Sequence, residues 1–226
     1  MKGKLPTDVV SREYAQSYAQ EQFKHLPEGE REVSLVEERM GRSLAGTKVL
    51  DLCGGPGQFS VLMAQKGAEV TWHDPSPSYL EIAQEKCKEF GVGVEFKLGG
   101  FDALSIYDDS SFDLVFNRVS WYYSDHEWRT FREVTRVLRP AGFFWLHTHN
   151  RKFIDGITSP IVKPIHLFCF HLHELVGIKL CHVPASSKRL QKWLFGKGLF
   201  RCLFADEAGK NFRFLAQKQP VATAPL

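Results

Sequence analysis

The stretch VLDLCGGPGQFS, residues 49–60, places three glycines and a proline directly behind a short apolar run. The apolar run predicts a buried strand, and the residues that follow predict the start of a helix. Glycines at such a turn let the backbone bend sharply and leave room for a ligand, while the first helical turn offers free N–H groups. The stretch therefore predicts a ligand-binding loop.

Strand and helix signals alternate on the C-terminal side of this loop. Short apolar runs predict strands at 48–52, 68–74, 92–98, 112–117 and 143–149. Helical spacing with glycine or proline stops predicts helices at 58–67, 76–91 and 126–142. Strands separated by helices predict βαβ units, and hence an α/β fold with a doubly wound, Rossmann-like, mainly parallel sheet.

The flanks of this core add further elements. Helix-forming residues predict two N-terminal helices, at 8–25 and 30–44, and the last third predicts a helical insertion, a helix at 186–198 and an antiparallel hairpin. We therefore expect a single domain over 1–226, made of an N-terminal helical cap (8–44), a cofactor-binding core (46–150), a helical lid insertion (151–183), and a final helix and hairpin (184–218).

Composition excludes several classes of protein. The 226 residues are 43% hydrophobic, which fits one globular domain, and the net charge of +3 is spread along the chain, so a nucleic-acid partner is not favoured. Five cysteines without a CxxC pair predict neither a disulfide framework nor a zinc ribbon. The chain has no apolar leader and no run of eighteen apolar residues, so we expect a cytoplasmic protein without a transmembrane segment.

The loop departs from two common phosphate-binding patterns. Ser60 stands where a nicotinamide fingerprint has its third glycine, and no Gly-Lys-Ser/Thr closes the loop. Two acids accompany it, Asp51 in the first strand and Asp74 at the end of the second. A carboxylate at the end of the second strand, such as Asp74, can accept hydrogen bonds from ribose hydroxyls. A carboxylate in the first strand, such as Asp51, favours a positively charged ligand. The pattern predicts a cationic cofactor that contains a nucleoside.

With these residues in view, the chain resembles the class I S-adenosylmethionine-dependent methyltransferases, over about residues 10–150 and the terminal hairpin. Four segments carry the resemblance in family order: VLDLCGGPGQFS (49–60), VTWHDPSPSYLEIA (70–83), SSFDLVFNRVSWYYSD (110–125) and REVTRVLRPAGFFWL (132–146). The resemblance implies that the cofactor is S-adenosyl-L-methionine and that its product is S-adenosyl-L-homocysteine.

The resemblance also implies roles for individual residues. The implied cofactor contacts are Gly55 and Gly57 along the loop, Asp51 near the methionine amino group, Asp74 at the ribose, Asn117 facing the methionine part, and Tyr18, or secondly Tyr14, as a cover. Cys53 replaces the first glycine of the family motif. On the adenine side, where the family often has Gly-Asp-Ala, either Asp102 recognises the ring or Phe101 stacks on it.

Methyl transfer can be achieved by positioning the acceptor, so a catalytic base is optional. Ligands of such sheets bind beyond the carboxyl ends of the strands, which makes Tyr122 and Tyr123 after the fourth strand and His149 at the end of the fifth the catalytic candidates. Alternation puts His147 on the same face as His149, and we expect His147 to be a packing residue.

The segment 151–183 is expected to cover the pocket and to select the acceptor. A helix over 160–180 would carry one apolar stripe, formed by Ile161, Ile165, Phe168, Leu172 and Leu175. This stripe predicts a partly apolar acceptor, or else contact with a membrane surface or with a second subunit in a homodimer. His166, Cys169 and His173 share another face, but no fourth ligand is evident, so no metal is expected.

We therefore expect methyl transfer from S-adenosylmethionine to oxygen, nitrogen or carbon of a small, partly apolar molecule. An RNA or protein methyltransferase is the alternative among enzymes; the mild charge and the sequence Asn117-Arg118-Val119-Ser120, in place of an Asn-Pro-Pro-Tyr type motif, count against it. A nicotinamide oxidoreductase comes third. A non-catalytic S-adenosylmethionine-binding regulator or partner subunit is the alternative of another class.

Overall fold

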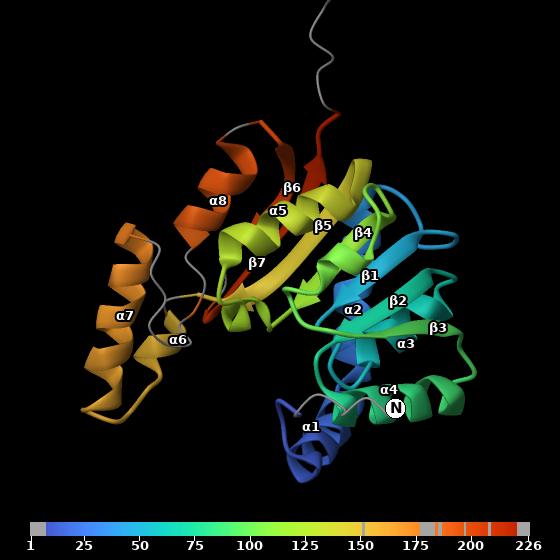
Figure 1. The fold of residues 1–226 in the computed structure, drawn as a ribbon, viewed down its shortest axis with the longest axis horizontal. Coiled ribbons are helices and arrows are strands. Elements are labelled where there is room, and N and C mark those ends of the chain that lie inside the picture. Colours follow the sequence, from blue (N-terminus) through green and yellow to red (C-terminus); the bar gives the residue numbers. More distant parts are fainter. Residues whose placement is uncertain are drawn as a thin grey trace, which may run out of the picture.

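The computed structural model describes residues 8–150, 152–176, 184, 187–196, 198–207 and 209–220. One mixed sheet runs through this part of the chain in the order β3-β2-β1-β4-β5-β7-β6 (Figure 1). Its strands are β1 (Lys48–Leu52), β2 (Glu69–Asp74), β3 (Val94–Leu98), β4 (Phe112–Arg118), β5 (Leu138–His149), β6 (Phe200–Asp206) and β7 (Asn211–Lys218). Strands β1 to β5 pair in parallel, and β7 pairs antiparallel with both β5 and β6. The predicted α/β class, parallel core and antiparallel C-terminal hairpin are confirmed.

Helices cover both faces of the sheet because successive strand residues point to opposite sides. Val49 packs with α2 (Leu26–Met40) and α3 (Gln58–Gln65), whereas its neighbour Leu50 packs with α5 (Glu127–Val137) and α8 (Ser187–Phe195). Alternate residues of β5 divide in the same way, with Trp145 on the α2 face and Phe144 on the α5 face. The remaining N-terminal helix, α1 (Arg12–Lys24), packs against α4 (Pro77–Glu89) beside the α2 face.

The predicted helix at 126–142 is wrong at its C-terminal end. Helix α5 stops at Val137, and Leu138 already has extended backbone, with φ −75° and ψ 133°. Leu138 pairs with Phe112, and the β4–β5 register then shifts before Phe143 pairs with Leu114. Pro140 therefore lies in a strand irregularity, where its missing N–H costs no ladder hydrogen bond. The chain thus enters β5 five residues earlier than the sequence predicts.

The winding of the chain decides where a ligand can bind. The path leads from β1 outward to β3 and then returns to place β4 on the other side of β1. Loops on the two sides of this crossing diverge, which opens a crevice at the carboxyl ends of β1 and β4. The glycine loop follows β1 there, and a short 3-10 turn, η2 (Trp121–Tyr123), follows β4.

The insertion after β5 forms two helices, α6 (Lys152–Asp155) and α7 (Val162–Val176). Helix α7 lies at one side of the molecule, away from α4 and β3 (Figure 1). Within the described ranges, no helix combines the length and the apolar character that crossing a bilayer requires.

Candidate functional site

The glycine loop is shaped by close packing against β2 and α4. A Cβ on Gly54 would lie 2.5 Å from Cδ1 of Trp72, and one on Gly57 would lie 2.8 Å from Cβ of Ala83. The Nε1 of Trp72 donates to the carbonyl of Gly55 at 2.9 Å, which fixes the middle of the loop. Gly57 therefore serves the start of α3 rather than the wall of a hollow, whereas Gly55 lines both hollows described below.

Cys53 adopts the left-handed conformation, with φ 57°, at the position where the family motif has glycine. This conformation costs a residue with a Cβ about 1–2 kcal/mol. Cys53 thus lies in the backbone region that favours glycine. The Cys53 side chain is half-buried against the α5 face of the core, and the residue lies in the lining of both hollows.

The two predicted acids, Asp74 and Asp51, form hydrogen bonds with the glycine loop and with residues next to it. Asp74 accepts hydrogen bonds from the backbone N–H groups of Gly55 and Ser76, both at 2.9 Å, and burial raises its pKa to about 6. Asp51 accepts one hydrogen bond, 2.7 Å long, from the hydroxyl of Ser60. Ser60, which stands at the third glycine position of a nicotinamide fingerprint, is therefore a buried partner of Asp51.

Asp51 is a buried carboxyl group without a described cationic partner. Burial, aided by the nearby charge of Asp74, raises its pKa to about 7 despite the hydrogen bond from Ser60. No described cationic group lies within ion-pair distance of its carboxylate. A ligand ammonium group placed here would favour the ionised form of Asp51, which fits the amino group of a bound amino acid.

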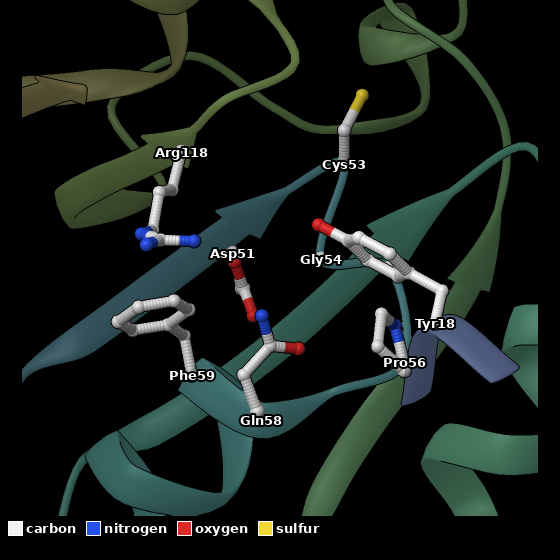
Figure 2. A pocket seen from close by; sticks show the side chains of 9 residues that line it. Tyr18, Asp51, Cys53, Gly54, Pro56, Gln58, Phe59 and Arg118 are labelled. Carbon is white, nitrogen blue, oxygen red and sulfur yellow. The ribbon is translucent and has the colours of Figure 1, made fainter. Parts of the chain in front are cut away.

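A small hollow of about 40 Å³ lies in front of Asp51 (Figure 2). Asp51 and Arg118 come from neighbouring strands and reach the same space, while Tyr18 of α1 closes it from the other side (Figure 2). Tyr18 thus lies where the sequence predicts a cover. Tyr14 stacks on Tyr18, with ring centroids 5.9 Å apart.

Arg118 is a site residue that sequence reasoning did not select. Its Nε donates to Oε2 of Glu32 at 3.1 Å, and its guanidinium lies 5.0 Å from the centre of the Phe59 ring. Glu32 also accepts hydrogen bonds from Nδ1 of His147 at 2.8 Å and Nε1 of Trp145 at 3.0 Å. Burial opposes ionisation of Glu32, but these partners together lower its pKa. His147 is therefore part of the support for Arg118, in line with its expected packing role.

Asn117 lies beneath the site and lines neither hollow. It is fully buried, and its Nδ2 donates to the carbonyl of Leu52 at 2.8 Å and to the hydroxyl of Ser120 at 2.7 Å. The side chain thus joins the ends of β1 and β4. Its predicted place facing the methionine part of a cofactor stays a prediction.

A larger cavity of about 910 Å³ adjoins the glycine loop. Its walls come from the N-terminal segment, the loops after β1, β2, β3 and β4, the start of α5, and the end of β5. The predicted site residues in these walls are Tyr18, Gly55, Asp74, Phe101, Asp102, Tyr122, Tyr123 and His149. Phe101 and Asp102 both reach the cavity, so both predicted adenine contacts remain available.

The catalytic candidates form one group of rings. Tyr122 stacks on His149, with centroids 5.8 Å apart, and its centroid lies 4.3 Å from that of Tyr123. His149 Nδ1 is 2.9 Å from Oδ1 of Asn211, and burial lowers the pKa of the imidazole. Burial raises the pKa of the Tyr122 phenol. At neutral pH His149 is therefore the group able to accept a proton, while Tyr122 keeps its own.

Helix α7 does not cover this cavity in the described residues. None of 152–176 lines it, and the predicted apolar stripe faces outward, with Ile161 72%, Phe168 64% and Leu175 82% exposed. The insertion reaches the cavity wall through Phe153 of α6. Its ring stacks on that of His149, with ring centroids 4.3 Å apart. The other face of α7, which carries the buried His173, packs inward instead.

The predicted histidine and cysteine face of α7 is divided between different partners. His173 is buried and its Nε2 lies 3.1 Å from Oε2 of Glu127, whereas Nδ1 of His166 lies 3.0 Å from the carbonyl of Val162. Cys169 packs among apolar residues of α6 and α7. Among the described residues, no group of three or more metal-ligand side chains is found.

Comparison with known proteins agrees with this geometry. Residues 49–142 match the family model described as "Methyltransferase domain". A "Ubiquinone biosynthesis O-methyltransferase" from Pseudomonas fluorescens is 35% identical over 119 residues, 53% of this chain and 50% of that protein. An "Uncharacterized methyltransferase YbaJ" from Bacillus subtilis is 29% identical over 139 residues, 62% of this chain and 50% of that protein. The chain thus spans about half the length of these relatives.

Solved structures show the same fold at low sequence identity. A "SAM dependent methyltransferase" from Aquifex aeolicus matches with a TM-score of 0.65 at 16% identity, covering 92% of this chain and 99% of that one. A protein from Pyrococcus horikoshii matches with a TM-score of 0.65 at 23% identity and 94% coverage of both chains. Residues 49–142 therefore carry a methyltransferase domain, and in its motif order and sheet order the chain is similar to the class I S-adenosylmethionine-dependent methyltransferases.

Proposed function

We propose that the protein transfers a methyl group from S-adenosylmethionine to a hydroxyl oxygen of a small molecule. The observation that carries the proposal is that Asp74 and His149 line one cavity. The ribose acid of a nucleoside cofactor and a neutral histidine thus face a shared space. At about 910 Å³ the cavity lies near the upper end of the roughly 300–1,000 Å³ usual for ligand sites. It therefore favours a cofactor together with an acceptor.

The chain offers complementary groups to each part of the cofactor. Asp51 and Arg118 present one acid and one base to the small hollow, which matches the amino and carboxylate groups of the methionine part. In this proposal Asp74 binds the ribose, and Phe101 and Asp102, which line the same cavity, bind the adenine. When bound, S-adenosylmethionine supplies a methyl group on a sulfonium: the S–C bond breaks as the O–C bond forms, and its electron pair stays on sulfur as a neutral thioether.

His149 is the residue placed to take the acceptor's proton. Because Oδ1 of Asn211 accepts, Nδ1 of His149 carries the ring proton and Nε2 keeps its lone pair. A neutral imidazole with a fixed tautomer suits a general base near neutral pH. Oxygen is favoured as the acceptor atom because relatives matched over residues of the core are named O-methyltransferases.

Two variants test the proposal by calorimetry and by transfer of a labelled methyl group to a panel of small hydroxylated compounds. We expect Asp74→Ala to weaken S-adenosylmethionine binding by about 1–3 kcal/mol, the value of a hydrogen bond to a charged group. We expect His149→Gln to lower kcat by about 10²–10⁴-fold while cofactor affinity is retained.

The matched control is His171→Gln, because His171 is exposed on α7 and lies outside the cavity lining. Binding of NAD in place of S-adenosylmethionine would overturn the proposal. Cofactor binding without turnover of any hydroxyl acceptor would favour the non-catalytic regulator instead.

A further inference from the structure

The acceptor half of the cavity carries chemistry that the cofactor does not use. With the glycine loop, Asp74 and the adenine side assigned to the cofactor, the remaining walls come from the N-terminal segment, η2, the start of α5 and the end of β5. Two features stand out in these walls. One is a set of aromatic rings, and the other is a guanidinium group.

The rings present a stacking surface. Tyr122, Tyr123 and His149 form a chain of ring contacts, which Phe153 extends behind His149. Tyr123 lines the cavity and is 53% exposed, so the residue is accessible to a ligand. Aromatic rings prefer offset-stacked or edge-to-face partners, and this surface therefore suits a planar aromatic acceptor.

The guanidinium belongs to Arg129, which lies in the first turn of α5 and lines the same cavity. In the described part of the chain, no carboxylate lies within 4.0 Å of it, although Asp125 precedes it by one helical turn. Arg118, the other arginine of the cavity, is paired with Glu32. Arg129 is thus the arginine of this cavity left to bind an anionic group of a ligand.

Among the residues that line the acceptor walls, Asp125 is the one carboxylate, and it does not pair with Arg129 within 4.0 Å. The planar fork of an arginine matches a carboxylate in a bidentate arrangement, and such charge-assisted pairs are stronger than neutral hydrogen bonds. A carboxylate on the acceptor would therefore be oriented by Arg129 while the ring lies on the tyrosines.

We propose that the acceptor is a hydroxylated aromatic acid, whose carboxylate is bound by Arg129 and whose ring packs on Tyr122 and Tyr123. The inference rests on the proposed O-methyl transfer for its reaction, but its binding step stands apart from turnover. The acceptor hydroxyl loses its proton to His149 as the O–C bond forms, and the carboxylate takes no part in bond making.

Three probes with the same diol ring test the inference: 3,4-dihydroxybenzoate, catechol and 3,4-dihydroxybenzylamine, which are anionic, neutral and cationic. Their affinities are measured by calorimetry on protein saturated with S-adenosylhomocysteine. We expect the benzoate to bind about 10- to 100-fold more tightly than catechol and the benzylamine to bind most weakly.

Variants on one helix separate the role of Arg129 from the general charge of the protein. Arg129→Gln should abolish the preference for the benzoate, and Arg129→Lys should retain part of it. Arg132→Gln, the same change of charge at an exposed position outside the cavity lining, should leave it unchanged. Asp125→Asn should strengthen benzoate binding, because it removes a like charge from the same wall.

The outcomes distinguish this inference from the proposed function. Equal affinity for the three probes, no measurable binding of any of them, or equal losses in Arg129→Gln and Arg132→Gln would each overturn the inference. A preference for the benzoate without methylation would support the inference and count against O-methyl transfer. Methylation of the probes without any charge preference would support O-methyl transfer and count against the inference.

Discussion

At the residue scale, Asp51 is predicted to couple cofactor recognition to stability. Its carboxyl group is buried, receives one hydrogen bond from Ser60 and has a pKa raised to about 7. A raised pKa means that folding favours the protonated form. The stability contributed by this protonated carboxyl is fully present below the unfolded value of 3.8 and is lost as the pH rises through about 7.

Asp51→Asn should therefore stabilise the cofactor-free protein most at alkaline pH. The amide is never charged, and one pKa unit corresponds to about 1.4 kcal/mol, so the gain in unfolding free energy should be about 2 kcal/mol or more larger at pH 8 than at pH 5. Urea denaturation at the two pH values measures it. Equal gains in unfolding free energy at the two pH values would show that the ionised carboxylate of Asp51 does not destabilise the folded protein.

The same substitution should remove a large part of the affinity for S-adenosylmethionine. In the wild-type protein this affinity should fall as the pH drops below about 7, because the cofactor's ammonium group requires the ionised carboxylate. The variant should bind weakly with a flatter pH profile. Opposite changes in stability and binding would be typical of a functional site.

At the scale of elements, the glycine loop depends on how closely α3 approaches α4. Gly57 has φ 87° and faces Ala83, so Gly57→Ala introduces both a left-handed alanine and an overlap at 2.8 Å. We expect a loss of about 2–4 kcal/mol in unfolding free energy, together with weaker cofactor binding. Thermal or urea unfolding measures the first and calorimetry the second.

Gly93→Ala is the matched control, because a Cβ there meets no heavy atom within 4 Å and the backbone is not left-handed. It should change stability by less than about 1 kcal/mol, in either direction. A similar loss in both variants would mean that the α3–α4 contact is not what requires glycine at position 57.

At the scale of the whole molecule, Glu32 joins the N-terminal helices to the far half of the sheet. It accepts hydrogen bonds from Arg118, Trp145 and His147, which lie 86 to 115 residues later in the chain. Glu32→Ala leaves buried donors without their acceptor and should cost about 3–5 kcal/mol in urea unfolding. Glu32→Gln, which keeps an acceptor oxygen, should cost less and should still weaken cofactor binding through Arg118.

Glu38→Ala on the same helix is the comparison, because Glu38 is 68% exposed and pairs only loosely, at 3.7 Å, with Arg39. Its effect should stay within about 0.5 kcal/mol. If Glu32→Ala were equally mild, the buried cluster would not hold the two halves together.

Local patterns of the sequence predicted most of the fold. The strand and helix alternation, the glycine loop, the acids Asp51 and Asp74 and the terminal hairpin could all be predicted, because each depends on neighbouring residues and backbone geometry. The end of α5 could not, since pairing of Leu138 with Phe112 overrides the helical preference of the residues around it. The exposure of the apolar stripe of α7 could not be predicted either, because periodicity predicts an apolar face but not what lies against it.

The sequence by itself indicated the resemblance to a family and the parallel core of the sheet, and it predicted which residues would meet the nucleoside. Tertiary structure alone decided that Arg118 pairs with Glu32, that Asn117 joins the ends of β1 and β4, and that Arg129 reaches the ring-lined half of the cavity. The physical reason is distance along the chain. Motifs encode contacts within a turn, whereas charge pairing and cavity walls join side chains that only the packed sheet and its helices bring together.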